Sequence, residues 1–541
     1  MDTLFRNWAR RLAVVIPAMN EEDRIGDVLR ETYRLAPDQV VVVVNGTVDR
    51  TAEIARSFGA DVLEYSEPLG NDVGRAIGAI RASADTYLFI DADIVIPAED
   101  MLPFVLDIEN GADVALNGID WVARHPRPHA PAVDRYFLNL VQGRRDLGVE
   151  NVLTVPHAFS ANALARIGKD TLANPQLANA IAIERKLRIV VSHDINVLLI
   201  NKVRNNHFRK SGERMPSAYQ RMHGDSVEAC AYLLDSAGRR AGFGEGGRKR
   251  WYYDEISAPR QGGTFRGRGG ANGLSVVLSV PDTSVYLAPF LAQLAETDVE
   301  VVPVVHGTSP KTRSYLKKYG FPFIDIPEFI GHDTAFAIGA EAAGGELLVF
   351  HDTAIPVDYY ELEPYVEALK RGIADIAVNK QSPPEADETP EADGDEPPYV
   401  GKLESMHPAQ IGGYFLNLTF GTNELGASSM LLPPYAMKRS VLETIGAAAL
   451  IDPGAAQAKA AMERYEFAAV GRIDVSGRIN EAVAPIVLNH DRILGDAMEG
   501  VRAWTAAFGA RGGFIDGGRR RELLADSASG AYRIDPHRPP G

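Results

Sequence analysis

The sequence contains almost no cysteine, since Cys230 is the only one in 541 residues. An intramolecular disulfide is therefore excluded, which is typical of proteins from a reducing compartment. Long hydrophobic runs are also missing, because no uncharged apolar stretch reaches the roughly 18 residues that a membrane-spanning helix needs. The apolar run Leu12–Ala18 is short and contains Pro17, so it favours a strand rather than a signal peptide. These absences predict a cytoplasmic protein without a membrane span.

Positive charge is scarce relative to negative charge, with 56 Lys and Arg residues against 72 Asp and Glu residues. The net charge of -16 argues against a nucleic-acid partner, because nucleic-acid binding requires a basic surface. Part of the acidity is local to a Pro-rich stretch, 382–398, that has few large apolar side chains. Such a segment cannot bury enough surface to offset its ordering entropy, so we predict a disordered insert there.

The sequence carries one architecture twice. The pentapeptide Tyr-Phe-Leu-Asn-Leu at 136–140 recurs at 414–418, and Val44–Thr47 matches Val305–Thr308. The spacing is far longer than the roughly 20–50 residues of a solenoid repeat, so each copy is a whole domain. We therefore predict a first domain at 1–258, a Gly- and Arg-rich linker at 259–273, a second domain at 274–529 that contains the acidic insert, and a tail at 530–541.

Short apolar runs alternate with helical patterns in the first copy. Strands are expected at 12–16, 39–44, near 62 and at 87–90, with helices at 21–35, 49–58 and 73–83. Continuous β-branched strands separated by helices indicate an α/β fold with a mostly parallel sheet covered on both faces. Ligands bind at the carboxyl ends of the strands in such sheets. The loops at 17–22, 45–49 and 91–97 are therefore the candidate site.

Two carboxylates follow the last of these strands directly. Asp91 and Asp93 come after the apolar end Leu88–Ile90. In an extended segment, residues two apart point to the same side, so both carboxylates can face one hard cation. A glycine-rich turn is missing after the first strand, which weakens a dinucleotide-binding interpretation. The pattern favours a metal site at the strand end.

Three segments together resemble the family 2 glycosyltransferases of the GT-A fold, namely Val15–Glu22, Val43–Ala52 and Phe89–Asp93. The resemblance implies two tandem GT-A-like, Rossmann-like domains and a UDP- or GDP-sugar donor with Mg²⁺ or Mn²⁺ on its diphosphate. Where the family often has an Asp at the second strand end, this chain has Asn45. The resemblance assigns the donor to Pro17, Ala18, Glu21, Asn45, Asp49, Arg75 and Asp91, and the metal to Asp91, Asp93 and His207.

The catalytic base is not identified by the motifs. Inverting members of the family usually have a Glu-Asp pair before a helix, whereas this chain reads Ala173–Leu177 without a carboxylate. That absence resembles the retaining glucosyl- and mannosyl-phosphoglycerate synthase type. Three carboxylates nearby are weak candidates, for each of which a solvated charge or helix cap is the simpler interpretation, and His157 lies where the acceptor region begins. The candidates are Asp170, Glu184 and Asp194.

The second copy keeps the apolar strands but loses the polar motifs. Pro310 replaces Asp49, Phe336 replaces Arg75, and His351–Thr353 is expected in the place of Asp91–Asp93. These losses predict a non-catalytic copy, which could act as a fused dimer half, bind an acceptor or support stability. A rival interpretation is a metal held by His351 and Asp352.

Two further motifs recur with a shared spacing. A basic segment at 242–250 matches 513–521, and Gly-Asp-x-x-Glu at 224–228 matches 495–499. The arginines could clamp phosphates or touch an anionic membrane, although a solvated linker or helix start is the simpler interpretation. Helix capping is the simplest role for Asp225 and Asp496.

We expect a metal-dependent glycosyltransferase that moves a sugar from a nucleoside-diphosphate donor to a hydroxyl acceptor, with catalysis in the first copy. A nucleotidyltransferase is one alternative, but it normally requires a glycine- and lysine-rich loop after the first strand. A non-catalytic sugar- or nucleotide-binding scaffold is another. Assembly into an oligomer is compatible with each of these three functions.

Overall fold

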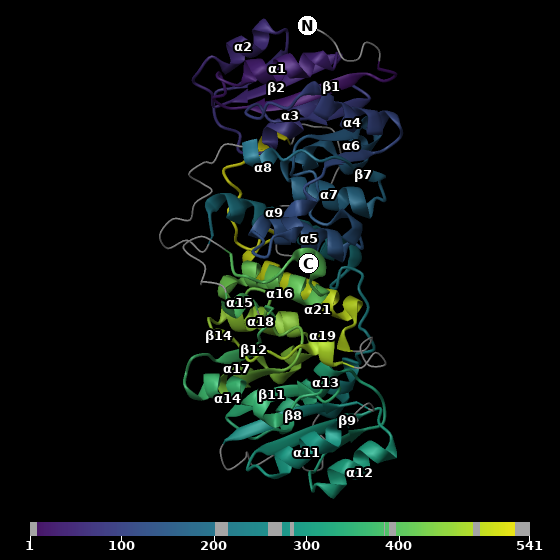
Figure 1. The fold of residues 1–541 in the computed structure, drawn as a ribbon, viewed down its shortest axis with the longest axis vertical. Coiled ribbons are helices and arrows are strands. Elements are labelled where there is room, and N and C mark those ends of the chain that lie inside the picture. The colour runs from purple at the N-terminus through teal and green to yellow at the C-terminus, as the bar shows by residue number, and fades with distance from the viewer. Residues whose placement is uncertain are drawn as a thin grey trace. The chain divides into compact units, whose positions relative to one another are not determined.

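The computed structural model describes residues 8–200, 215–257, 273–281, 286–383, 385–388, 397–479 and 487–524 (Figure 1). The described chain divides into two compact units. Unit 1 consists of the residues up to Tyr232 together with the segment that begins at Gly509, and unit 2 extends from Leu233 to Phe508. The sequence-based boundaries at 258 and 274 stay predictions for the extent of the duplicated sequence.

Unit 1 contains a seven-stranded, mostly parallel sheet in the order β3-β2-β1-β4-β6-β5-β7. Strand β6 is the antiparallel member, since it pairs antiparallel with both β4 and β5. Runs of Val and Ile form the central strands because β-branched side chains suit a pleated, buried surface. The strands are β1 (Leu12–Ala18), β2 (Gln39–Asn45), β3 (Asp61–Tyr65), β4 (Thr86–Phe89), β5 (Val114–Asn117), β6 (His157–Ser160) and β7 (Ile189–His193).

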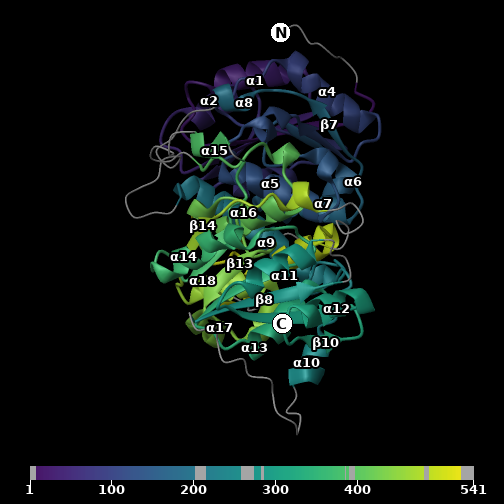
Figure 2. The ribbon, with the colours of Figure 1, turned by 60° about the horizontal axis from the view of Figure 1, so that its bottom comes forward.

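Helices cover both faces of this sheet. Alternate residues of β1, including Val14 and Ile16, pack on α1 and α4, which lie side by side in Figure 2. The opposite face carries α3, which packs on β1 and β2. The helices of unit 1 are α1 (Ile25–Arg34), α2 (Thr51–Ser57), α3 (Val73–Arg81), α4 (Ala98–Glu109), α5 (Ala130–Val141), α6 (Ala161–Ile167), α7 (Pro175–Glu184), α8 (Val197–Ile200) and most of α9 (Ser217–Ala237).

Unit 2 contains a second seven-stranded sheet in the order β10-β9-β8-β11-β13-β12-β14. This order repeats that of unit 1 strand for strand, and β13 is again the antiparallel member. The strands are β8 (Leu274–Val280), β9 (Glu300–His306), β10 (Ile324–Ile326), β11 (Leu347–Asp352), β12 (Ile376–Asn379), β13 (Tyr435–Lys438) and β14 (Phe467–Val470).

The second sheet has one apolar cluster on each of its two faces. Val276 and Leu278 of β8 pack toward α11 and α14, whereas Val277 packs toward α13. Figure 1 shows α11 and α12 on one side of β8 and β9, with α13 on the other. The helices of unit 2 are α10 (Trp251–Ser257), α11 (Leu287–Ala295), α12 (Pro310–Lys318), α13 (His332–Ala342), α14 (Glu363–Lys370), α15 (Glu385–Glu388), α16 (Pro408–Phe420), α17 (Arg439–Ile445), α18 (Pro453–Met462), α19 (Val475–Arg478) and α21 (His490–Phe508).

The predicted α/β class with two mostly parallel sheets is confirmed. In the first hundred residues, each predicted strand and helix is found, with ends shifted by a few residues. The short helix α15 lies inside the stretch predicted as a disordered insert, most of which falls outside the described residues. Among the helices of the described chain, none combines the length and the apolar character that crossing a membrane requires.

Candidate functional site

The carboxyl ends of β1 and β2 bring the first two predicted loops together. The side chain of Asn45, at the end of β2, donates to the Ala18 carbonyl at 3.2 Å and accepts from the Leu69 amide at 3.1 Å. The Glu21 amide donates to Thr51 Oγ1 at 2.8 Å, which ties the first loop to the start of α2. Asn45 and Glu21 are both buried. The side chain of Asn45 therefore links the ends of β1 and β2 with the loop that contains Leu69.

Asp49 joins the same two loops through its carboxylate. Its Oδ1 accepts from the Thr51 amide at 2.9 Å and its Oδ2 accepts from the Glu22 amide at 3.1 Å. Burial disfavours the charged form, but the hydrogen bonds from Thr51 and Glu22 outweigh it and lower the pKa of Asp49. The carboxylate is thus ionised and fixes the loop that the sequence predicted to bind the donor.

Asp91 follows β4 at the same edge of the sheet and is held by an arginine. Arg75 Nη2 donates to Asp91 Oδ1 at 2.6 Å, and the Asp91 side chain is 29% exposed. Asp93, two residues further, is also partly exposed. Arg75 itself is buried and forms a second ion pair with Asp72. The structure therefore brings together Asp91 and Arg75, two of the residues that the sequence predicted to bind the donor.

Small residues allow α3 to bring Arg75 this close to the sheet. A Cβ atom on Gly78 would lie 2.3 Å from Val15 Cγ1, and one on Gly74 would lie 3.0 Å from Pro17 Cβ. The backbone of helix α3 therefore packs directly on the side chains of β1. The residue before the helix, Asp72, has a φ of 71°, a left-handed conformation that costs energy in a residue other than glycine.

A buried ion-pair network continues from Asp72 away from Asp91. Asp72 Oδ2 accepts from Arg519 Nη2 at 2.8 Å and from Arg221 Nη1 at 3.2 Å. Arg519 also forms two bonds with the carboxylate of Asp225, at 2.5 and 2.8 Å. Asp225 lies within α9 and is fully buried. The network thus connects the strand-end carboxylate to the C-terminal segment of the chain.

These contacts correct two predictions. Asp225 and Asp496 are not helix caps, because α9 begins at Ser217 and α21 begins at His490. Both side chains lie inside their helices and pair with arginines. The basic segments are not solvated linkers either, since Arg248 and Arg519 are almost fully buried. Burial overrides the usual exposure of arginine here because each guanidinium meets carboxylates.

The Gly-Asp-x-x-Glu motif forms a socket for an arginine, which we call the arginine socket. Arg511 Nη1 donates to Asp225 at 2.7 Å and to Glu228 at 2.8 Å. A Cβ atom on Gly224 would lie 2.7 Å from Arg511 Nη2, so the glycine makes room for the guanidinium. Sequence reasoning missed this pairing. The signal was present, because the motif and the basic segment repeat with the same spacing between the copies.

His157 lies beside the network at the start of β6. Its ring stacks on Phe89 with centroids 5.1 Å apart, and its Nδ1 contacts the Thr154 carbonyl at 3.1 Å. Burial, together with the charge of Arg75, lowers the pKa of His157 to about 3. Within the described part of the chain, its Nε2 has no hydrogen-bond partner. The imidazole is therefore neutral.

The predicted catalytic carboxylates lie on separate elements. Asp170 lies in a short 3-10 helix at 169–173, and Asp194 is exposed after β7. Glu184, the last residue of α7, accepts a hydrogen bond from the Tyr232 hydroxyl and is exposed. Their assignment as catalytic groups stays a prediction. His207, the predicted third metal ligand, lies outside the described residues.

The antiparallel strand pairs show which residues of the two sheets are equivalent. Phe89 on β4 pairs with His157 on β6, and Phe350 on β11 pairs with Tyr435 on β13. In both pairs the ring centroids are 5.1 Å apart. Phe89 and Phe350 therefore occupy the same position in their sheets.

This register corrects the expected place of the second carboxylate motif. Counting two residues on from the paired phenylalanines, Asp352 and not His351 is the counterpart of Asp91. Ala354 then stands where unit 1 has Asp93. Unit 2 has thus kept the first carboxylate and lost the second. The spacing that relates Asp49 to Pro310 and Arg75 to Phe336 also places Asp352 opposite Asp91, so the expected match of His351–Thr353 was off by one residue.

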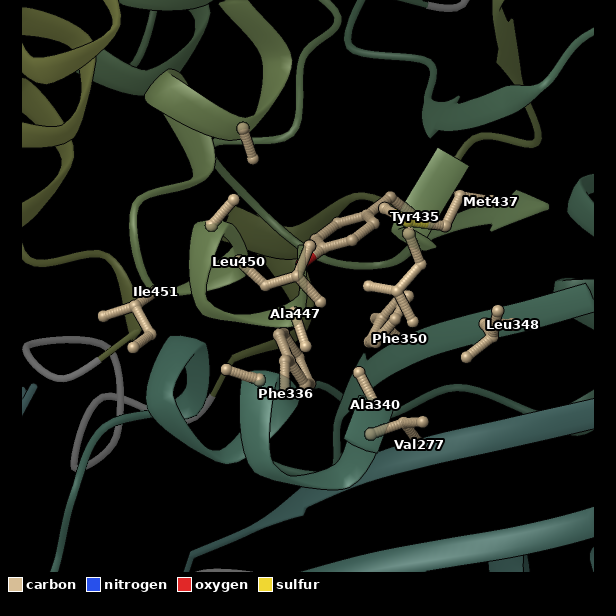
Figure 3. Close-up of a cluster of buried hydrophobic side chains, with 14 of the residues drawn as sticks. Val277, Phe336, Ala340, Leu348, Phe350, Tyr435, Met437, Ala447, Leu450 and Ile451 are labelled. Carbon is tan, nitrogen blue, oxygen red and sulfur yellow. The ribbon is translucent and has the colours of Figure 1, made fainter. Parts of the chain in front are cut away.

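The position of Arg75 is occupied by an apolar side chain in unit 2. Figure 3 shows Phe336 pointing into a cluster with Phe350 and Tyr435. Its ring centroid is 5.7 Å from that of Phe350 and 5.9 Å from that of Tyr435. Asp352 instead faces His332, whose Nδ1 is 3.3 Å from the carboxylate. Unit 2 therefore lacks the arginine that supports the strand-end carboxylate of unit 1.

One group of three acidic residues in the described chain is compact enough to hold a metal ion, and it lies in unit 2. The group consists of Asp452, Asp496 and Glu499. Arg240 donates to Asp496 at 2.8 Å, and Arg250 donates to Glu499 at 2.8 Å. These carboxylates are neutralised by arginines, as in the arginine socket of unit 1. The geometry therefore favours the binding of guanidinium groups over the binding of a metal ion.

Acid should destabilise unit 1 through this network. Burial opposes ionisation of Asp72 and Asp225, but Arg75 and Arg519 outweigh it and lower both pKa values. A lowered folded-state pKa gives stability that is present above the ordinary value of about 4 and is lost as pH falls below it. We expect the Tm, followed by circular dichroism, to fall steeply below about pH 4. The Asp225→Asn variant should show a shallower dependence, and a Tm that is constant to pH 3 would contradict the prediction.

Comparison with known proteins finds relatives for the N-terminal region. Residues 13–165, which extend from β1 to α6, match the model of glycosyl transferase family 2. This match confirms the predicted resemblance for that region, whereas the duplication of the whole domain stays a prediction.

Two curated relatives match over 104 residues each. A dolichyl-phosphate hexose transferase of Haloferax volcanii is 38% identical, over 19% of this chain and 45% of its own length. A 4,4'-diaponeurosporenoate glycosyltransferase of Staphylococcus aureus is 32% identical, over 18% of this chain and 28% of its own length. The match thus spans less than half of either relative.

Solved structures of Mycobacterium tuberculosis glucosyl-3-phosphoglycerate synthase are also similar. The complex with Mn²⁺, UDP and glucosyl-3-phosphoglycerate is 20% identical, covers 42% of this chain and 87% of its own, and has a TM-score of 0.32. The complex with Mn²⁺, UDP-glucose and phosphoglyceric acid is 21% identical over 42% of this chain and 86% of its own, also with a TM-score of 0.32.

Proposed function

We propose that unit 1 is a sugar transferase, because residues 13–165 match the model of glycosyl transferase family 2. It moves a sugar from a nucleoside-diphosphate donor to a hydroxyl acceptor. The observation that carries this proposal is the placement of Asp91 and Asp93 at the carboxyl end of β4, inside the matched region. Ligands of parallel α/β sheets bind at this edge.

The residues at this edge fit a divalent cation. Two partly exposed carboxylates offer hard oxygen ligands, which suit Mg²⁺ or Mn²⁺. Within the described chain, Arg75 engages Oδ1 of Asp91, which leaves Oδ2 for the ion. When bound, the cation offsets the negative charge that develops on the departing diphosphate. Asp91 and Asp93 are the proposed ligands, and His207 stays a predicted third one.

Side chains of unit 1 fix the conformation of the sheet edge where the donor is proposed to bind. Arg75 orients the Asp91 carboxylate by a charge-assisted bond, which is stronger than a neutral one. Asn45 and Asp49 fix the loops after β1 and β2, where we propose that the nucleoside binds. Pro17, Ala18 and Glu21 complete the proposed donor contacts. The acceptor hydroxyl and the group that takes its proton stay unassigned.

Unit 2 is proposed to be non-catalytic. It lacks counterparts of Asp93 and Arg75, and Phe336, which stands in the place of Arg75, packs in an apolar cluster with Phe350 (Figure 3). A buried aromatic ring cannot orient a carboxylate as a guanidinium does. We therefore confine the proposed donor site to unit 1.

The first experiment is calorimetric titration of the full chain with UDP-glucose, GDP-mannose and their relatives, with Mn²⁺, Mg²⁺ or EDTA present. We expect one donor class to bind only with a divalent cation and to be hydrolysed slowly when no acceptor is present. Binding that is unchanged in EDTA would reject the metal, and no binding of any donor at millimolar concentration would reject the transferase proposal.

A further inference from the structure

The two basic segments are exchanged between the units. The C-terminal arm, defined as residues 509–524, follows α21 of unit 2 but belongs to unit 1. The first arm, defined as residues 238–250, follows α9 of unit 1 but belongs to unit 2. In Figure 1 the yellow C-terminal arm lies among the elements of unit 1. Each unit is therefore completed by a segment from the other copy of the sequence.

The C-terminal arm packs closely on the loop that precedes α3. The Arg520 amide donates to the Leu69 carbonyl at 2.9 Å, and Arg519 Nε donates to the Asn71 carbonyl at 2.9 Å. Gly70 has a φ of 79°, and a Cβ atom on it would lie 2.7 Å from the Arg519 Cα. No side chain would fit between the loop and the arm at this point.

The same loop contacts the proposed donor site on its other side. The Leu69 amide donates to Asn45 Oδ1 at 3.1 Å. Asp72, at the end of the loop, pairs with both Arg519 and Arg75, and Arg75 pairs with Asp91. One carboxylate therefore separates the arm from the arginine that supports the proposed metal ligand. The left-handed backbone of Asp72 needs such surrounding contacts to persist.

Unit 2 repeats this docking with the first arm. Arg248 pairs with Asp333 at 3.2 Å and with Asp496 at 2.6 Å, as Arg519 pairs with Asp72 and Asp225. The Lys249 amide donates to the Ile330 carbonyl at 3.0 Å, and a Cβ atom on Gly331 would lie 3.1 Å from the Arg248 Cα. The docking is thus the same, but in unit 2 it leads to Phe336 rather than to an arginine.

We propose that the C-terminal arm is a positioning element of the donor site in unit 1 and that Arg519 is its central residue. Arg519 holds Asp72, which fixes the Arg75 guanidinium on Asp91. The proposal rests on the donor site proposed above. It gives the non-catalytic second copy a role, because that copy delivers the arm that the first copy needs.

Arg519 acts through Asp72 rather than on the substrate. Its side chain is fully buried, and its guanidinium is shared between Asp72 and Asp225. Ligand phosphates therefore have no access to it. Residues behind a metal ligand commonly change metal affinity or activity by about 10–100-fold when they are replaced.

The test compares Arg519→Gln with Arg248→Gln in the full chain. The two arginines are equally buried and have equivalent partners, so both variants should lower the Tm to a similar extent. The Kd for UDP and for GDP with Mn²⁺ should rise by about 10–100-fold in Arg519→Gln alone. Amide hydrogen exchange of residues 69–76 should also rise in Arg519→Gln alone. Arg519→Lys, which keeps the charge but not the forked geometry, should fall between Arg519→Gln and the wild type.

The outcomes separate this proposal from the proposed function. If the wild type binds nucleotide and Arg519→Gln binds it equally well, the arm has no positioning role. If the wild type binds no nucleotide, the transferase proposal fails, and the exchange of residues 69–76 still tests the arm. Equal exchange of that segment in Arg519→Gln and Arg248→Gln would then overturn the positioning role. If Arg519→Gln does not fold, Arg519→Lys supplies the same comparison.

Discussion

Replacement of Asp91 and Asp93 by asparagine together is expected to lower donor turnover by at least about 10²–10³-fold, the usual cost of losing an electrostatic group that stabilises a transition state. The asparagine amides keep the shape of the carboxylates but not their charge, so they bind a divalent cation poorly. The measurement is kcat for donor hydrolysis at saturating Mn²⁺ and donor. Because Asp91 is partly exposed, we expect the fold to survive the change.

The matched control for this prediction is Asp352→Asn. Asp352 occupies the place of Asp91 in unit 2 but faces His332, and Ala354 stands in the place of Asp93. The control should leave kcat within about twofold of the wild type, because Asp352 belongs to unit 2 and is not part of the proposed donor site, and changes at independent sites act separately. If the control lost as much activity as the Asp91 and Asp93 double variant, unit 2 would be the catalyst. Turnover by the double variant at more than half the wild-type rate would remove both carboxylates from the reaction.

The local part of the site could be predicted from the sequence because its signals are local. The apolar run before Asp91 indicates a buried strand, and parallel topology places the ends of such strands at one edge. Asn45, Asp49 and Asp91 were found at that edge for this reason. The role of Asn45 could not be predicted, because the partners of an amide depend on loops 24 to 27 residues away.

The exchange of the arms could not be predicted, because the two copies carry the same motifs. A basic arm and a Gly-Asp-x-x-Glu motif occur in each copy, so pattern matching shows that they belong together but not which arm meets which socket. Arg519 lies 294 residues from Asp225 in the sequence, and Arg240 lies 256 residues from Asp496. Only the path of the chain decides between the near and the distant pairing.

Burial was the second feature that the sequence obscured. Runs of arginine normally indicate a solvated surface, because a lone buried charge is costly. Arg511 and Arg519 are buried in spite of this tendency, since Asp225 lies between them and accepts from both. A preference that holds for single residues therefore fails where opposite charges are buried as a group.

Replacement of Asp225 by alanine should be the most destabilising single change in unit 1. It removes the carboxylate that Arg511 and Arg519 share, and it leaves two guanidinium groups buried with incomplete pairing. Breaking a buried ion pair by removing one partner costs about 3–5 kcal/mol, largely because the other charge stays desolvated. We expect a loss of this size in urea unfolding followed by circular dichroism. A loss below about 1 kcal/mol would show that Asp72 and Glu228 suffice to neutralise the arginines.

Two further variants identify the cause of that loss. Asp496→Ala removes the equivalent carboxylate from unit 2, where it pairs with Arg240 and Arg248, so it should cost a similar amount but leave nucleotide binding unchanged. Adding Arg519→Met to Asp225→Ala removes one of the unpaired charges. If desolvated charge is the cause, the double variant should be more stable than Asp225→Ala alone, because a buried ion pair can be replaced by apolar side chains at little cost. If the double variant were less stable still, the arm would be held mainly by its contacts with the loop at 69–72, and the charges would be secondary.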